Sequence, residues 1–141
     1  MKFWDSSAII PLLIAEQGRE QLLSLLERDP AMIAWWGTPV ECSSAIARRE
    51  REANLDVESA TDVLDRLNLL AGAWHEVAPT DRVRTAAQRL LRVHSLRSAD
   101  ALQLGAALVA SEYEPGSLEF VCLDDRLKVA AQREGFRIVA V

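Results

Sequence analysis

The chain has 141 residues, of which 50% are hydrophobic and 26% charged, and its formal net charge is −5. This length suits one domain with a sizeable core, so we expect residues 1–141 to form a single domain. No window is apolar over the roughly 18 residues that a membrane span requires. Residues 1–5 lack the apolar segment of a secretory signal, so the expected location is the cytoplasm.

The acidic net charge argues against a protein that holds nucleic acid by phosphate contacts alone, because such proteins are usually basic. A bound cation would change this balance, since the composition does not count its charge. Cys42 and Cys122 form no CxxC pair and no metal-ligand spacing, so zinc and redox sites are not indicated. Both are expected to be reduced thiols in the cytoplasm.

Short apolar runs alternate with helical periodicity, which predicts an α/β fold with a mainly parallel sheet. Strands are expected at 2–4, 32–35, 75–78, 119–123 and 137–141, with the last at an edge or late in the sheet. Helices are expected after residue 5 (bent or split at Pro11) and from residue 18, then over 38–53, 57–71, 83–91, 98–111 and 126–134. Gly135 is a suitable C-cap for the last helix.

Asp100 lies in the most apolar of these helices, 98–111, which we expect to be buried because it is apolar nearly all round. An ionised carboxylate there is costly unless it is paired or binds a metal. Its only near polar neighbour on the same face is Gln103. A structural role stays open, since an aspartate at a helix start interacts well with the helix dipole or pairs with Arg97.

Three further acids fall where an α/β fold gathers functional groups. Asp5 and Asp124 each follow an apolar strand, and ligands bind where the carboxyl ends of parallel strands meet. Each is also a good helix N-cap. Glu41 fits a capping box in which Thr38 is the N-cap residue and Glu41 is at N3, and this structural role is compatible with a place in a site.

Four carboxylates close together would repel one another and raise each other's pKa. A divalent cation removes that cost, and ligands that are all oxygen favour Mg²⁺ or Mn²⁺ over zinc. The sequence therefore predicts a metal site formed by Asp5, Glu41, Asp100 and Asp124.

Four stretches carry a family resemblance: FWDSSA at 3–8, TPVE at 38–41, LRSADALQL at 96–104 and FVCLDDRL at 120–127. In this order the chain resembles the PIN-domain family, and closely its VapC-type toxins of type II toxin–antitoxin modules. The resemblance covers essentially the whole chain. It implies a PIN-like three-layer α/β/α sandwich with a mainly parallel central sheet, and an Mg²⁺- or Mn²⁺-dependent endoribonuclease that hydrolyses phosphodiester bonds.

The resemblance also implies a role for each acid. Asp5, Asp100 and Asp124 would gather the metal, directly or through water, and Glu41 would hold a water molecule or a second ion. It implies a second group of supporting residues as well: Ser7, Cys122 and Asp125. Ser7 matches a hydroxyl that supports the acids, and Asp125 either joins the site or begins a helix. Cys122 replaces a frequent threonine, and a thiol is a weaker hydrogen-bond partner, which puts its support of Asp124 in doubt.

The partners implied by the resemblance are an RNA substrate, a cognate VapB-type antitoxin and a second copy of the chain. The antitoxin would cover the early helices and reach into the acidic site with a basic residue. Its groove would involve Ile10, Leu12, Leu13, Leu22 and Leu26, although the same residues could equally belong to the core. The RNA target and the residues that bind it cannot be identified from the sequence.

Two alternatives remain open. One is a PIN-fold scaffold that binds RNA or a partner without cleaving. The other is an Asp-dependent phosphatase, which needs an acid where Ser7 stands and a lysine that Lys128 is poorly placed to provide.

Several other features have simple structural interpretations. At least one of Trp35 and Trp36 is expected in the core, the histidines at 75 and 94 on the surface or in packing, and the arginines at 48–51 and 82–92 on solvated faces.

Overall fold

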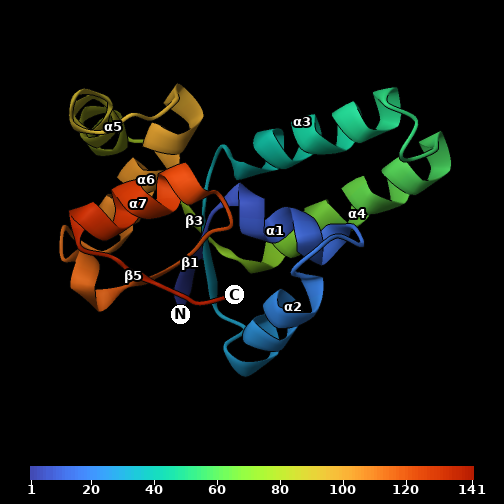
Figure 1. The fold of residues 1–141 in the computed structure, drawn as a ribbon, viewed down its shortest axis with the longest axis horizontal. Helices are drawn as coiled ribbons and strands as arrows, with labels where there is room; N and C mark the ends of the chain where they lie inside the picture. Colours follow the sequence, from blue (N-terminus) through green and yellow to red (C-terminus); the bar gives the residue numbers. More distant parts are fainter.

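The computed structural model describes residues 1–141 and confirms the α/β class (Figure 1). The strands are β1 (Lys2–Trp4), β2 (Met32–Trp35), β3 (His75–Val77), β4 (Glu119–Val121) and β5 (Arg137–Ile138). The helices are α1 (Ser6–Leu13), α2 (Arg19–Arg28), α3 (Thr38–Arg51), α4 (Val57–Ala73), α5 (Asp81–Val93), α6 (Ser98–Ala110) and α7 (Asp125–Glu134). A short 3-10 turn, Pro115–Ser117, precedes β4.

The five strands are all parallel and lie in the order β3-β2-β1-β4-β5. The chain builds outward from β1 to β3 and then returns to the other side of β1 with β4 and β5. In open sheets of this kind, ligands bind at the carboxyl ends of the strands where the order reverses. That place lies between β1 and β4, so the residues that follow these two strands face the expected binding position.

Helices cover both faces of the sheet, α1 to α4 on one and α5 to α7 on the other (Figure 1). Successive strand residues alternate between the two cores. Phe3 and Phe120 stack in the core beneath α5 to α7 with ring centroids 5.3 Å apart, whereas Trp4 and Val121 lie in the core beneath α1 to α4. Burial on both faces explains why the three central strands, β2, β1 and β4, are mostly apolar. The predicted three-layer α/β/α sandwich with a parallel central sheet is confirmed.

The sequence correctly marks α6 as a buried helix, with Ala101, Leu104 and Ala107 fully buried. It packs very closely on α5, because a Cβ atom at Gly105 would lie 3.1 Å from the Val83 carbonyl oxygen. This close packing fixes the N-terminal turn of α6, which carries Asp100, at the edge of the sheet. Although α6 is strongly apolar, neither it nor any other helix of the structure has the length and apolarity needed to cross a bilayer.

Three boundaries differ from the sequence-based expectation. Helix α1 continues through Pro11 to Leu13 and is not split at the proline. Strand β4 ends at Val121 instead of residue 123, so two residues separate it from Asp124. Strand β5 is only two residues long instead of reaching residue 141, because at the edge of the sheet it pairs with β4 alone, through Arg137 and Ile138.

The leucines of the early helices divide into core and partly buried positions. Leu12, Leu13 and Leu22 are all buried, with at most 7% of their surface exposed. Ile10 and Leu26 are only partly buried and pack against the same core. The expected groove for an antitoxin therefore cannot use the first three side chains as they lie here, because they form the interior of the protein.

Candidate active site

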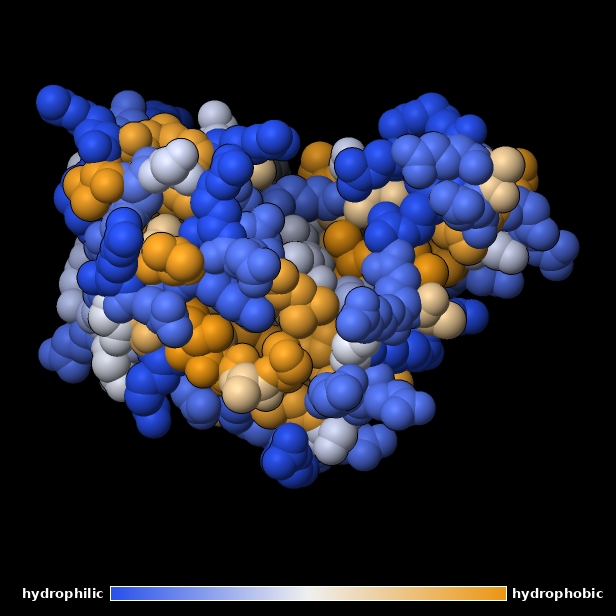
Figure 2. All heavy atoms as spheres, in the orientation of Figure 1, coloured by the Kyte–Doolittle hydropathy of each residue, from blue (hydrophilic) through white to orange (hydrophobic).

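All four predicted acids line one open pocket of about 870 Å³ at the carboxyl ends of the strands. In the space-filling view the surface is hollowed between α7 and α3, on the side where these helices begin (Figure 2). The pocket is lined by Asp5, Ser6, Ser7, Ile10, Val40, Glu41, Ser44, Ala45, Arg48, Arg97, Ala99, Asp100, Asp124, Asp125 and Arg126. Residues separated by more than a hundred positions in the sequence thus share one surface.

Asp5 lies at the centre of the site because it follows the central strand, β1. It is the N-cap residue of α1, and its Oδ2 atom accepts hydrogen bonds from the Ser7 amide at 3.1 Å and the Ser7 hydroxyl at 2.5 Å. Only 3% of Asp5 is exposed. Burial raises the pKa of its carboxyl group, and the charge of Asp100 adds to this, although the hydrogen bonds from Ser7 oppose it.

Ser7 joins the loop after β4 to the start of α1. Its hydroxyl donates to Asp5 and accepts a hydrogen bond from the Leu123 amide at 2.9 Å. The Cys122 sulfur lies 3.6 Å from the same hydroxyl, 3.7 Å from Asp5 Oδ2 and 3.4 Å from the Asp124 carbonyl oxygen. The thiol therefore contacts the carboxylate of Asp5 and the backbone of Asp124. Burial and the nearby charge of Asp5 raise the pKa of the Cys122 thiol, so it stays protonated.

Glu41 is held by two other elements. Its Oε1 atom accepts a hydrogen bond from the Ser6 hydroxyl at 3.0 Å, and its Oε2 atom accepts one from the Gln103 side-chain amide at 2.8 Å. The predicted capping box is wrong, because the N-cap residue of α3 is Gly37 and Thr38 is already inside the helix. Burial, followed by the charge of Asp5, raises the pKa of Glu41 to about 7.

Gln103 is a site residue that the sequence marked only as a neighbour of Asp100. It is fully buried, and its amide nitrogen also donates to the Thr38 hydroxyl at 3.0 Å. Its amide oxygen has no hydrogen-bond partner. The available signal was a polar side chain in the apolar interior of the helix, beyond its first turn, since a buried amide needs partners. The identity of those partners, on α3, depends on the fold.

Asp100 and the two aspartates of α7 complete the acidic lining. Asp100 is partly buried in the first turn of α6, where burial and then the charge of Asp124 raise its pKa. Asp124 is exposed and caps α7, accepting a hydrogen bond from the Leu127 amide at 2.9 Å. Asp125 begins α7 and lines the pocket without a side-chain partner. The N-cap roles considered for Asp5 and Asp124 are therefore real and coexist with a place in the pocket.

The acids in the pocket offer carboxylate oxygens, which are the ligands that a hard divalent cation such as Mg²⁺ prefers. Burial first, and then the charge of a neighbouring carboxylate, raises the pKa values of Asp5, Glu41 and Asp100. As the side chains stand, no group of three acids, histidines or cysteines is gathered closely enough to hold an ion. The pocket thus offers suitable ligands that are not already arranged around a common centre.

Residues outside the pocket have mainly structural positions. Trp35 is buried in the core at 6% exposure, whereas Trp36 is 54% exposed and does not line the pocket. His94 joins α5 to α7 through a contact of 2.7 Å with Glu134, and His75 lies exposed on β3. The expectation that neither histidine belongs to the acidic site agrees with these positions.

No family profile matches this sequence. Ribonuclease VapC45 and Ribonuclease VapC49, both from Mycobacterium tuberculosis strains, are each 29% identical to the chain over 136 residues, which is 96% of this chain and 92% of each relative. Among solved structures, FitAcB from Neisseria gonorrhoeae has a TM-score of 0.68 at 16% identity, covering 99% of this chain and 97% of that one. FitAB bound to a DNA fragment has a TM-score of 0.66 at 16% identity, covering 99% and 94%. The chain is therefore a relative of the VapC ribonucleases that adopts the PIN-like α/β/α fold.

Proposed function

We propose that this protein is a metal-dependent endoribonuclease, the toxin of a VapBC-type toxin–antitoxin pair, and that Asp5, Glu41, Asp100 and Asp124 are its catalytic acids. The observation that carries this proposal is the convergence of the four acids on one pocket at the switch point of a parallel sheet. The names of the two mycobacterial relatives support the ribonuclease activity.

Asp5, Asp100 and Asp124 would hold Mg²⁺ or Mn²⁺, with Glu41 beside them. Because the acids are not gathered around a common centre, binding would draw their side chains together or use bridging water molecules. When bound, the ion supplies Lewis acidity and positive charge to balance the phosphate and the carboxylates.

The chain's own residues would perform the remaining tasks. Ser7 holds Asp5 in place through its hydroxyl, and Ser6 and Gln103 hold the two oxygens of Glu41. A carboxylate whose two oxygens are held by hydrogen bonds in this way can act as a general base. Glu41 would accept the proton of the attacking water, the oxygen of that water would bond to phosphorus, and the ribose oxygen that leaves would take a proton from solvent.

An antitoxin and a second copy of the chain are the proposed protein partners. Support comes from the resemblance to VapC-type toxins over nearly the whole chain. We expect a dimer in solution at micromolar concentration, measured by light scattering or native mass spectrometry. A clean monomer mass would contradict the homodimer without affecting the proposed activity.

The test of the activity is cleavage of a mixed RNA pool by the purified protein with Mg²⁺, with Mn²⁺ and with EDTA, beside the Asp100→Asn variant prepared identically. We expect discrete fragments that require metal and disappear in the variant. Equal cleavage by both proteins would reveal a contaminating nuclease. Metal binding without any cleavage by the wild type, across tRNA, rRNA and mRNA substrates, would favour the non-catalytic scaffold.

An Asp-dependent phosphatase receives no support from the geometry. Such an enzyme needs a second acid two residues after the first, and Ser7 stands there instead, fully engaged with Asp5 and Leu123. Cleavage of a simple phosphate monoester such as p-nitrophenyl phosphate, but not of RNA, would reverse this conclusion.

A further inference from the structure

We propose that three arginines form a phosphate-binding rim around the acidic pocket: Arg48, Arg97 and Arg126. This rim contacts the phosphates that neighbour the cleaved phosphate on the same RNA strand. This inference rests on the proposed function and adds the substrate-binding residues, which the sequence leaves unidentified.

The three arginines come from three separate elements and line the same pocket as the acids. Arg48 is on α3, Arg97 directly precedes α6, and Arg126 is in the first turn of α7. The positive charges of Arg97 and Arg126 act on the carboxylate of Asp100, which places both beside the acids. The rim therefore surrounds the acidic centre on more than one side.

None of the three guanidinium groups is engaged elsewhere. Arg48, Arg97 and Arg126 are exposed, and their side chains make no hydrogen bond or ion pair. The neighbouring Arg49, in contrast, pairs with Glu16 and donates to the Ala45 carbonyl oxygen. A free guanidinium keeps all five of its N–H donors available, and its planar shape suits the oxygens of a phosphate.

The rim also supplies positive charge to a surface that would otherwise repel RNA. The whole chain has a net charge of −5, and the pocket contains five carboxylic acids. An RNA strand would be repelled from this surface unless cations outside the acidic centre attract its phosphates. The three arginines are the only basic side chains that line the pocket.

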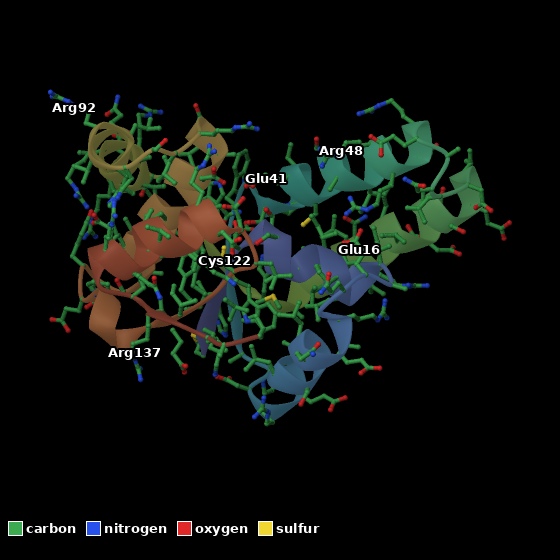
Figure 3. All side chains as sticks on the ribbon, viewed as in Figure 1. Glu16, Glu41, Arg48, Arg92, Cys122 and Arg137 are labelled. Atoms are coloured by element: carbon green, nitrogen blue, oxygen red, sulfur yellow. The ribbon has the colours of Figure 1, made fainter.

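The spacing of the rim suits a strand and not a single phosphate. Val40, Ser44 and Arg48 repeat every four residues along α3 and line the pocket from one helix face. Arg48 lies seven residues after Glu41, which corresponds to about 10 Å along the helix axis, and Figure 3 shows the two labelled side chains at separate positions on this helix. Arg97 and Arg126, however, adjoin Asp100 and Asp124. We infer that a ligand which meets all three extends along α3.

The test measures binding of a fluorescently labelled single-stranded RNA of mixed sequence, by anisotropy at several salt concentrations with Mg²⁺ present. The protein carries Asp100→Asn so that the probe is not cut. Arg48→Gln, Arg97→Gln and Arg126→Gln are added singly and together. Arg92→Gln and Arg137→Gln are matched controls, since both arginines are exposed, have no side-chain partner and lie away from the pocket (Figure 3).

We expect each rim variant to weaken RNA binding by about 3- to 10-fold and to reduce the slope of log K against log salt by about 0.7, the value for one phosphate contact on a single strand. The triple variant should lose about 2 in slope, while both controls stay within about twofold of the parent. Unchanged affinity and slope in the rim variants would overturn the proposal, as would no RNA binding by the parent protein.

The two proposals fail in different ways. Salt-dependent RNA binding that requires the rim, without any cleavage by the protein that retains Asp100, would remove the nuclease activity and leave the rim. Metal-dependent cleavage that is unchanged in the three rim variants would leave the nuclease and remove the rim. If the variants bind an oligolysine probe more tightly but bind RNA as before, the arginines control access of a basic protein segment and the proposed RNA contact is wrong.

Discussion

At the scale of single residues, the site depends on side chains that hold other side chains. Glu41 reaches its position through Ser6 on α1 and Gln103 on α6, and Asp5 through Ser7. Each of these supporting contacts is only a hydrogen bond, but it restricts where a carboxylate oxygen can lie. Groups of this kind next to a metal site commonly change affinity or activity by about 10- to 100-fold when they are removed.

Gln103 provides a direct test of this support. We expect Gln103→Leu to reduce metal affinity or the cleavage rate by about 10- to 100-fold, because Glu41 and Thr38 lose their shared donor. Calorimetric titration with Mn²⁺ and a cleavage time course measure the two quantities separately. Ser111→Ala removes a different buried polar group, a hydroxyl at the end of α6 that does not line the pocket, and it should leave both values unchanged. Wild-type metal affinity and cleavage in Gln103→Leu would contradict the role of Gln103.

The raised pKa of Glu41 predicts a pH-dependent cost in the metal-free protein. Because the pKa rises from 4.5 in the unfolded chain to about 7 in the folded one, the folded state binds more protons between these values, and stability falls as pH rises through this window. We expect Glu41→Gln to stabilise the metal-free protein by about 1–3 kcal/mol at pH 8 and to have little effect below pH 4.5.

Urea unfolding at the two pH values, in EDTA, measures this difference. Glu50→Gln is the matched control, since Glu50 is exposed on the same helix and makes no side-chain contact, so its effect should not depend on pH. A Glu41→Gln variant that is equally stabilised, or destabilised, at both pH values would show that the carboxyl group is not held in a raised-pKa environment.

At the scale of elements, the α5–α6 pair fixes the position of Asp100. The two helices approach so closely at Gly105 that a side chain there would meet the backbone of α5, at 3.1 Å from both the Ala87 amide nitrogen and the Val83 carbonyl oxygen. His94 and Arg89 then join the end of α5 to Glu134 on α7. The helix that carries Asp100 is thus packed against α5, which in turn is joined to α7.

We expect Gly105→Ala to destabilise the protein by about 1–3 kcal/mol, because backbone atoms of α5 must move to make room. The contrasting change is Gly72→Ala in α4, where a Cβ atom would meet nothing within 4 Å. That change should stabilise the protein by about 0.5–1 kcal/mol, since alanine is the better helix former. Thermal unfolding of both variants measures the difference, and equal effects at the two glycines would contradict the close approach of the helices.

At the scale of the whole molecule, the parallel order β3-β2-β1-β4-β5 brings the acids together. Asp5 follows the central strand, Glu41 follows β2 and Asp124 follows β4, so one edge of the sheet collects acids from distant parts of the chain. The same arrangement places like charges side by side. Because a bound cation would relieve this repulsion in the folded state, we expect the cation to stabilise the fold.

We therefore expect Mn²⁺ to raise the unfolding free energy at pH 8, by about 2.7 kcal/mol when its free concentration is a hundred times the dissociation constant. Only the folded state brings the carboxylates to one pocket, so a bound metal would favour that state. Thermal unfolding with increasing Mn²⁺, beside Asp100→Asn, tests this. A midpoint that does not respond in the wild type, or responds equally in the variant, would show that the acidic pocket does not bind the ion.

Much of the fold and the list of candidate acids could be predicted from the sequence, because their signals are local. Apolar runs identify the central strands, helical periodicity identifies α4 and α5, and Gly135 ends α7 with a left-handed conformation. Each of the four acids falls close after a strand or at a helix start, and a parallel sheet collects such positions at one edge. The family resemblance depends on the same local stretches.

Only the tertiary structure decided which side chains meet. Glu41 is 35 residues from Ser6 and 62 from Gln103, so a local pattern suggested a capping box where the fold provides distant partners. The leucines of α1 and α2 suited a core or a docking face equally well until their burial was known. Hydropathy and spacing describe a chain only along its own axis, whereas hydrogen bonds, burial and charge coupling depend on distances between segments that the packing of the sheet and helices establishes.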